Sequence, residues 1–189
     1  MTYERAPELE VVQWFNTTAP LSLRDLRGRV VIIEAFQMLC PGCVSHGLPL
    51  AQRVASHFRN SDVTVLGLHT VFEHHAAQDT PVALGAFLDE YRITLPVGMD
   101  RPSPAGGAPT TMRRLQLRGT PSLLIIDREG FIRQRYFGAV YALALGAEIA
   151  SLLGEAPAAG AVEPTARAAS CDENGCTIEP PETQSGTTG

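Results

Sequence analysis

Cys40 and Cys43 are the side chains of this sequence whose types and spacing best fit redox chemistry. They follow an apolar, β-branched run over 30–36 and precede a helical pattern over 44–58, which places them where a helix begins. Unpaired N–H groups and the dipole at a helix N-terminus stabilise a thiolate, so we expect a lowered pKa for Cys40. The thiol of Cys43 can then resolve a mixed disulfide. Thiol-disulfide exchange is therefore favoured over the two alternatives, half of a structural zinc site or two inert thiols.

An acidic residue and a proline fit the same chemistry. Glu34 interrupts the apolar strand six residues before Cys40, where an ionised carboxylate is costly to bury. A buried carboxyl with a raised pKa can accept and return the proton of Cys43; the alternative is a side chain at a solvated sheet edge. X-Pro bonds supply most cis peptides. We expect Thr120–Pro121 to be cis and to expose the Thr120 backbone to an extended substrate, the alternative being an ordinary turn.

Alternating strand and helix patterns position these residues. The apolar and β-branched runs predict strands over 8–15, 30–36, 63–69, 95–99, 122–127 and 130–136, and the helical spacings predict helices over 44–58, 82–91, 110–117 and 141–153. Pro49 predicts a kink in the first helix. This order predicts an α/β fold whose central mixed sheet has helices on both faces.

Composition divides the chain near Gly154. Residues 1–153 carry the apolar patterns of one domain, whereas residues 154–189 are rich in Ala, Pro, Glu, Thr, Ser and Gly. Such a segment buries too little apolar surface to offset its ordering entropy. We therefore expect a flexible, disordered C-terminal tail.

The arrangement of motifs resembles the thioredoxin fold and, more closely, the TlpA/ResA-like thiol-disulfide oxidoreductases, over about residues 8–153. The resemblance rests on Glu34 six residues before Cys40-Pro41-Gly42-Cys43, on Leu23-Arg24-Asp25-Leu26-Arg27-Gly28-Arg29-Val30-Val31, on an insertion after the second buried strand, on Gly119-Thr120-Pro121-Ser122 and on Asp127-Arg128-Glu129-Gly130. It implies a thioredoxin-like fold in which Cys40 attacks and Cys43 resolves. It further implies that Glu34 is the buried acid and that Thr120 and Pro121 form a cis-proline face. Leu39 departs from the aromatic residue usual before the first cysteine.

The tail carries a second cysteine pair, Cys171 and Cys176, separated by four residues. Asn174-Gly175 between them favours a turn that brings the two thiols together. A coil of the 17 residues 154–170 reaches roughly 20–25 Å, enough to return to the first pair. We predict a secondary redox pair that relays electrons within the molecule or between two copies. Soft-metal capture by the thiolates and an inert tail are the alternatives.

A thiol peroxidase of the peroxiredoxin type is the alternative enzyme. That chemistry uses a Thr or Ser three residues before the peroxidatic cysteine and a Pro four residues earlier still. Gln37 and Ile33 occupy those positions before Cys40. Because the hydroxyl that would polarise a peroxide is missing, disulfide exchange is the favoured chemistry.

A metal-binding module is the alternative from another functional class. His69, His74 and His75 lie close together with Glu73 among them, and imidazole with carboxylate can bind a metal. A solvated loop is the alternative and is favoured, because a loop rarely holds both His74 and His75 in the orientation that a metal site needs. We therefore assign no metal ligand and expect no dissociable cofactor.

Charge and hydropathy exclude several kinds of partner. The 189 residues include fifteen Arg and no Lys against twenty Asp and Glu, a net charge of −5, without the basic stripe of a nucleic-acid binder. The acidic balance argues against docking on anionic membranes, and no apolar run approaches the roughly 18 residues that span a bilayer. With Met1 as the native start and no secretory signal, we expect a cytoplasmic protein. Its expected partners are a disulfide-containing protein or small molecule and, as electron donor, a dithiol protein or small thiol.

Overall fold

A computed structural model describes residues 3–155, 169–172 and 175–178. The chain divides into two units, Met1–Ala156 and Pro157–Gly189. The first unit contains, in chain order, β1 (Glu4–Arg5), β2 (Val11–Phe15), β3 (Val30–Phe36), η1 (Cys43–Gly47), α1 (Leu48–His57), β4 (Val63–His69), α2 (His75–Gln78), α3 (Pro81–Glu90), β5 (Val97–Asp100), α4 (Thr110–Arg114), β6 (Ser122–Ile126), β7 (Phe131–Phe137) and α5 (Ala142–Gly154). The second contains β8 (Ala169–Asp172) and β9 (Gly175–Ile178).

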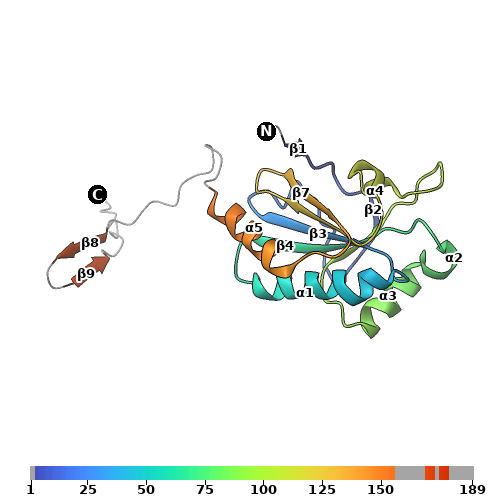
Figure 1. Cartoon of the computed structure of the whole chain (residues 1–189), viewed down its shortest axis with the longest axis horizontal. Coiled ribbons are helices and arrows are strands. Elements are labelled where there is room, and N and C mark those ends of the chain that lie inside the picture. The colour runs from blue at the N-terminus through green and yellow to red at the C-terminus, as the bar shows by residue number, and fades with distance from the viewer. Residues whose placement is uncertain (1–2, 156–168, 173–174, 179–189) are drawn as a thin grey trace, which may run out of the picture. The chain divides into compact units, whose positions relative to one another are not determined.

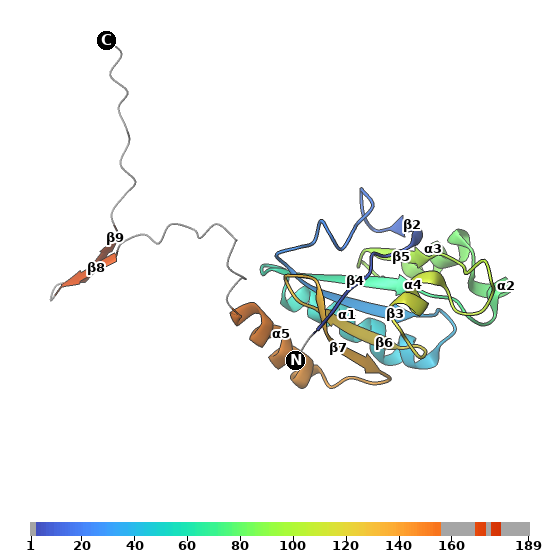
Figure 2. The same ribbon diagram turned by 90° about the horizontal axis from the view of Figure 1, so that it is seen from above.

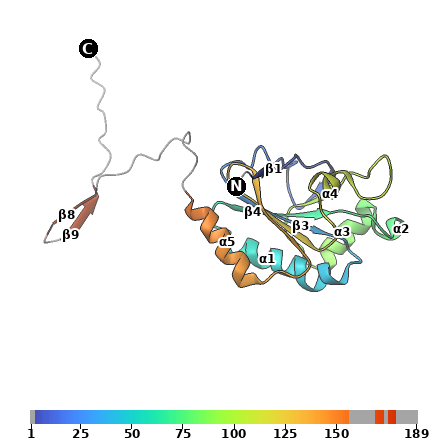
Figure 3. The same ribbon diagram turned by 45° about the horizontal axis from the view of Figure 1, so that its top comes forward.

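Seven strands of the first unit form one mixed sheet in the order β1-β7-β6-β3-β4-β5-β2. The pairs β3–β4 and β4–β5 are parallel, and the others are antiparallel. Helices α1, α3 and α5 cover one face, and α4 lies on the opposite face (Figures 1, 2 and 3). The predicted α/β architecture with helices on both faces is therefore confirmed.

Strand β3 lies at the centre of this sheet, and all seven of its residues are buried. Successive side chains of a strand point to opposite faces: Ile32 and Phe36 pack in the core beneath α1 and α5, whereas Ile33 packs in the core of the other face. Glu34 lies two residues from each of Ile32 and Phe36, so its side chain points to the same face as theirs. The strand therefore directs its one carboxyl toward α1, the helix that follows the cysteines.

Strands β3 and β4 have the predicted bounds, and the other predicted elements are present with shifted ends. Strand β2 begins at Val11 rather than at residue 8, because the Glu8 carboxylate instead accepts hydrogen bonds from the backbone N–H groups of Leu23 and Arg24, at 2.9 and 2.8 Å. The short elements β1 and α2 were not predicted. No helix among the described residues is long and apolar enough to cross a membrane.

Candidate active site

The two cysteines of the first pair lie where the chain leaves β3 and enters the first helix. Cys40 and Cys43 are at disulfide distance, with their Cα atoms 5.2 Å apart. Cys43 is fully buried, whereas Cys40 is partly exposed. The backbone N–H of Cys43 donates to Cys40 Sγ at 3.2 Å, the kind of contact that stabilises a thiolate at a helix start. The exposed sulfur is thus the one a substrate can reach.

The predicted helix over 44–58 consists of a π-helical turn, η1, followed by α1. Pro49 directly follows the π turn, as the second residue of α1, and it has no N–H to donate to the preceding turn. The backbone N–H of Leu48 donates to the carbonyl of Cys43, a wider turn than that of an α-helix. Such turns are frequent at functional sites. Here the change of helix type occurs at the proline for which a kink was predicted.

Glu34 lies buried beneath the π turn that begins at Cys43, against Gly47, with only 1% of its surface exposed. Burial raises its pKa from 4.5 to about 8, because a carboxylate loses its hydration there. Its Oε1 atom has no hydrogen-bond partner among the described residues. A carboxyl with this pKa is mostly protonated at pH 7 and can both give and take a proton near neutrality.

Gly47 makes room for this carboxyl and was not singled out from the sequence. A Cβ at position 47 would collide with Glu34 Oε1 and lie 3.2 Å from Pro121 Cβ. Only a glycine therefore lets the π turn pack against both residues. A glycine inside a helical pattern is the sequence signal that could have marked it.

The Thr120–Pro121 peptide bond is cis, as predicted, and its residues face the cysteines. Cys40 Sγ lies 3.6 Å from the carbonyl oxygen of Thr120. A Cβ at Gly42 would lie 3.3 Å from Pro121 Cδ, so the cysteine loop and the proline are in close contact. All five site residues predicted from the first domain are thus gathered at one end of β3; their chemical roles stay predictions.

Two buried glutamines hold the cysteine loop and were missed from the sequence. Gln78 Oε1 accepts the backbone N–H of Leu39 at 3.2 Å, and Gln78 Nε2 donates to Gln37 Oε1 at 3.2 Å. Gln37 Nε2 in turn donates to Glu73 Oε1 at 3.3 Å and lies 3.5 Å from Thr120 Oγ1. The insertion that contains α2 therefore braces both the cysteine loop and the proline face. A lone glutamine carries no sequence signal for such a network.

Two exposed apolar side chains lie beside residues of the site. Leu39, directly before Cys40, is 56% exposed, and so is Phe137 at the end of β7. Phe137 pairs with Ser122, next to the cis proline, and the Arg118 guanidinium lies 5.7 Å from its ring centroid. An apolar rim with one cation suits a peptide better than a small ionic molecule.

A model of the AhpC/TSA family matches residues 3–135 of this chain. The chain belongs to this family. A crystal structure of a thioredoxin-like superfamily protein is 62% identical, with a TM-score of 0.78, over 80% of this chain and 97% of that one. A thiol-disulfide isomerase from Corynebacterium glutamicum is 49% identical, with a TM-score of 0.75, over 80% and 98%. These findings confirm the thioredoxin-like fold and the likeness to TlpA/ResA-like proteins, and they support an oxidoreductase.

Curated relatives extend well beyond this chain. Protein DipZ of Mycobacterium tuberculosis is 26% identical over 136 residues, which are 70% of this chain and 18% of that protein. The chain thus spans less than a fifth of the length of that relative.

The peroxidase alternative gains no support from the site. Gln37, which stands where a peroxidatic cysteine would need a hydroxyl, is 1% exposed and binds the other members of the glutamine network. Its amide holds the loop that contains α2. The AhpC/TSA match is equally consistent with disulfide exchange, and the similar solved structures include a thiol-disulfide isomerase.

The histidines considered as metal ligands are not gathered. His69 is fully buried, neither ring nitrogen has a partner among the described residues, and burial lowers its pKa to about 4. It packs against Phe36, with ring centroids 5.3 Å apart, whereas His75 pairs with Asp79 at 3.3 Å. In the part of the chain that the structure describes, no three His, Cys, Asp or Glu side chains are grouped to hold a metal ion.

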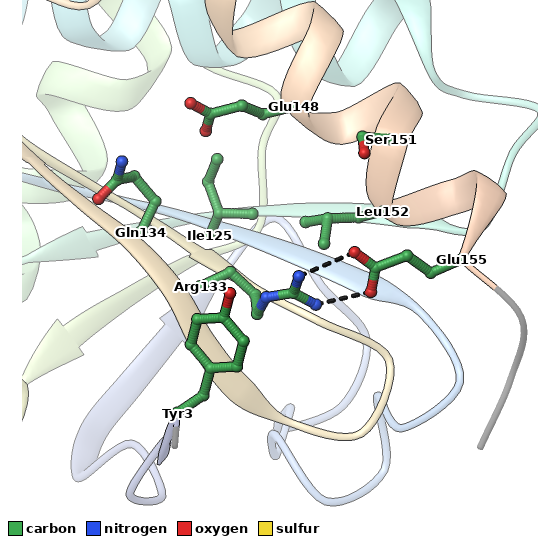
Figure 4. Close-up of a pocket in the computed structure, with 8 residues that line it drawn as sticks. All are labelled: Tyr3, Ile125, Arg133, Gln134, Glu148, Ser151, Leu152 and Glu155. Atoms are coloured by element: carbon green, nitrogen blue, oxygen red, sulfur yellow. Dashed lines mark hydrogen bonds and ion pairs between the residues drawn. The ribbon is translucent and has the colours of Figure 1, made fainter. Parts of the chain in front are cut away.

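Away from the cysteines, a pocket of about 210 Å³ lies between β7 and α5, and no cysteine lines it (Figure 4). Arg133 crosses it and forms a two-pronged ion pair with Glu155, at 2.7 and 2.8 Å. Its guanidinium also lies 4.4 Å from the Tyr3 ring centroid. Because Arg133 and Glu155 are paired with each other and Glu148 accepts the hydroxyl of Tyr136, this pocket anchors the end of α5 rather than binding a charged substrate.

Strands β8 and β9 are the described part of the tail, and they form an antiparallel pair that was not predicted. Cys171 and Cys176 are register partners in this pair, which agrees with the prediction that the chain brings them together. Of the rest of the predicted disordered tail, Gly154 ends α5 and Glu155 pairs with Arg133, whereas 156–168, 173–174 and 179–189 lie outside the described residues. The boundary at residue 153 and the disorder stay predictions.

Proposed function

We propose that this protein exchanges disulfides through the Cys40–Cys43 pair. The observation that carries the proposal is the partly exposed sulfur of Cys40, at a helix start and 3.6 Å from the Thr120 carbonyl oxygen. The fully buried Cys43 stands behind it with the buried acid Glu34. This arrangement provides a nucleophile, a resolving thiol, a proton acceptor and a place for an extended substrate. It requires no dissociable cofactor.

The reducing direction illustrates the chemistry. The Cys40 thiolate attacks a substrate disulfide held against Thr120–Pro121: a Cys40–substrate bond forms, the substrate S–S bond breaks, and the departing thiolate takes a proton from water. Glu34 then accepts the proton of Cys43. The Cys43 thiolate attacks Cys40 Sγ, so that the Cys40–Cys43 bond forms, the mixed disulfide breaks and the second substrate thiolate is protonated. Two electrons have passed to the substrate, and a donor dithiol restores them by the reverse steps.

The substrate class in this proposal is a protein disulfide presented in an extended segment. Leu39, next to Cys40, and Phe137, the register partner of Ser122, are exposed apolar side chains that a peptide can contact. The electron donor is a dithiol protein or a small thiol. The predicted cytoplasmic location stays a prediction, which fractionation of the source cells tests.

We further propose that Cys171 and Cys176 form a second dithiol that exchanges with the first pair. Register partners in an antiparallel pair have Cα atoms about 4.5–5.5 Å apart, within the range that a disulfide requires. Trapping with Cys43→Ser, which leaves Cys40 unresolved, should yield a mixed disulfide with a tail cysteine. Peptide mapping that finds none, within or between molecules, would overturn this relay.

Reduction of insulin by dithiothreitol tests the main proposal. Wild type should accelerate insulin precipitation, whereas Cys40→Ser should lose the acceleration entirely and Cys43→Ser most of it. The double variant Cys171→Ser/Cys176→Ser should keep it, because dithiothreitol replaces any internal donor. Equal rates for wild type and Cys40→Ser would refute disulfide exchange. Peroxide consumption that survives Cys43→Ser but not Cys40→Ser would favour the peroxidase.

A further inference from the structure

A cavity of about 80 Å³ is lined both by the buried carboxyl of Glu34 and by exposed residues. Glu34 is its buried wall, and Ser45, His46 and Arg53 line it from the first helix. Gly138, Ala139 and Val140 close the other side. His46, Arg53 and Ala139 are exposed, whereas Glu34 is 1% exposed. The volume is several times the roughly 10–15 Å³ that one water molecule needs.

Turnover by the proposed function requires this carboxyl to exchange protons with solvent. Because a carboxyl with a pKa of about 8 is mostly protonated at pH 7, Glu34 must release a proton to solvent before it can accept the proton of Cys43. Its Oε1 atom has no partner among the described residues, so no hydrogen bond within that part of the chain conducts the proton away. The cavity is the route by which water can reach it.

The contacts of Ser45 determine which nitrogen of His46 carries the proton. Ser45 Oγ lies 2.7 Å from the carbonyl oxygen of Pro41 and 2.6 Å from His46 Nδ1. A hydroxyl has one proton, and the carbonyl can only accept, so Ser45 donates to Pro41. His46 Nδ1 must therefore be the N–H that donates to Ser45. The lone pair of the neutral ring then resides on Nε2, which is free to accept a proton.

The other groups around the cavity do not compete for this role. Arg53 is the other charged side chain in the lining, and a guanidinium does not give up its proton in proteins. The wall formed by 138–140 has no titratable side chain. Cys43, on the same helix, is the thiol whose proton is being moved.

We propose that His46 relays protons between Glu34 and bulk solvent through this cavity. The inference rests on the proposed function and adds a residue to its machinery. His46 acts through Glu34 and touches neither sulfur nor substrate. It should therefore change the rate at which the disulfide opens and closes without changing the equilibrium between the two forms.

Oxidation of the reduced Cys40–Cys43 pair by oxidised glutathione, followed by acid quenching and alkylation, measures this step without any unknown substrate. We expect His46→Gln to slow it about tenfold, less than the roughly 10²–10⁴-fold of a group that moves the reacting proton itself. Ala139→Leu, which narrows the cavity mouth and keeps the imidazole, should also slow it. The matched control is His57→Gln, an exposed histidine that does not line the cavity, and it should react like wild type.

Added imidazole distinguishes a relay from a structural role. The rate of His46→Gln should rise with imidazole concentration toward the wild-type rate, and the wild-type rate should not respond. The equilibrium with glutathione should be the same in both proteins. In a Glu34→Gln background, His46→Gln should cause no further loss, because the group it serves is gone.

Three results would overturn the relay: a wild-type rate in His46→Gln, a shifted glutathione equilibrium without imidazole rescue, or a full tenfold loss in the Glu34→Gln background. A Cys40–Cys43 pair that oxidised glutathione cannot oxidise in wild type is a different result. It would refute the proposed function itself.

Discussion

Glu34→Gln separates two consequences of burying a carboxyl behind a redox disulfide, one for stability and one for catalysis. The variant keeps the shape of the side chain and removes its ability to ionise. Burial raises the pKa of Glu34 from 4.5 to about 8. Between these pH values the unfolded chain has released the proton and the folded protein still holds it.

The sign and size of the stability effect follow from linkage. Because the folded state binds more protons in this window, the stability contributed by the protonated carboxyl is full below pH 4.5 and is lost as the pH rises through 8. At about 1.4 kcal/mol per pKa unit, the loss amounts to about 3 kcal/mol by pH 7 and about 5 kcal/mol above pH 8. Glu34→Gln should remove this loss. It should also slow disulfide exchange about 10²-fold, because the general base is missing.

The assay is urea unfolding of the oxidised proteins at pH 5, 7 and 8.5, together with insulin reduction at pH 7. A buried amide has its own cost, so the informative quantity is how the difference in unfolding free energy between variant and wild type changes with pH. It should move by several kcal/mol in favour of the variant from pH 5 to 8.5. Parallel pH profiles for the two proteins would refute the raised pKa, and an unchanged insulin rate would refute the role of Glu34 as base.

Three other substitutions have outcomes set by contacts in the structure. Gly47→Ala should destabilise the protein by about 1–3 kcal/mol through overpacking, and this stability should recover in a Glu34→Ala background. Gly146→Ala, on an open helix surface, should instead stabilise it by about 0.5–1 kcal/mol. Thermal unfolding of these variants, of Glu34→Ala and of wild type checks this. As the pH falls from 6.5 through 4, wild type should lose about 3 kcal/mol of unfolding free energy at His69, because the unfolded imidazole binds a proton there and the buried one does not. His69→Phe should remove this loss. Equal acid sensitivity of the two proteins would contradict the prediction. Gln78→Leu should lower the unfolding free energy by about 1–3 kcal/mol, because it leaves the backbone N–H of Leu39 unpaired. It should also slow insulin reduction, and an unchanged rate would disprove a role for Gln78 in holding the loop.

Much of the framework could be predicted because its signals are local. The β-branched run over 30–36 has no face that could lie in water, so it predicts a central strand with the bounds that β3 has. Cysteines directly after such a strand and before a helical pattern must lie at a helix start. A carboxyl within that strand must be buried, as Glu34 is.

The contacts that complete the site could not be predicted, because each depends on residues far apart in the chain. Gly47 is required only because the fold brings Glu34 and Pro121 to its surface. Gln78 holds the cysteine loop from 39 residues away, and nothing in its local sequence distinguishes it from a solvated glutamine.

The sequence by itself determined where the cysteine pair, the strand that precedes it, the buried acid and the proline lie, since residue type and short-range periodicity carry that information. Only the tertiary structure decided the π turn against Glu34, the glutamine network and the cavity that His46 lines. The physical reason is that close packing and hydrogen-bond geometry depend on which surfaces meet. Which surfaces come into contact follows from sheet order and helix placement, and no local sequence pattern encodes these.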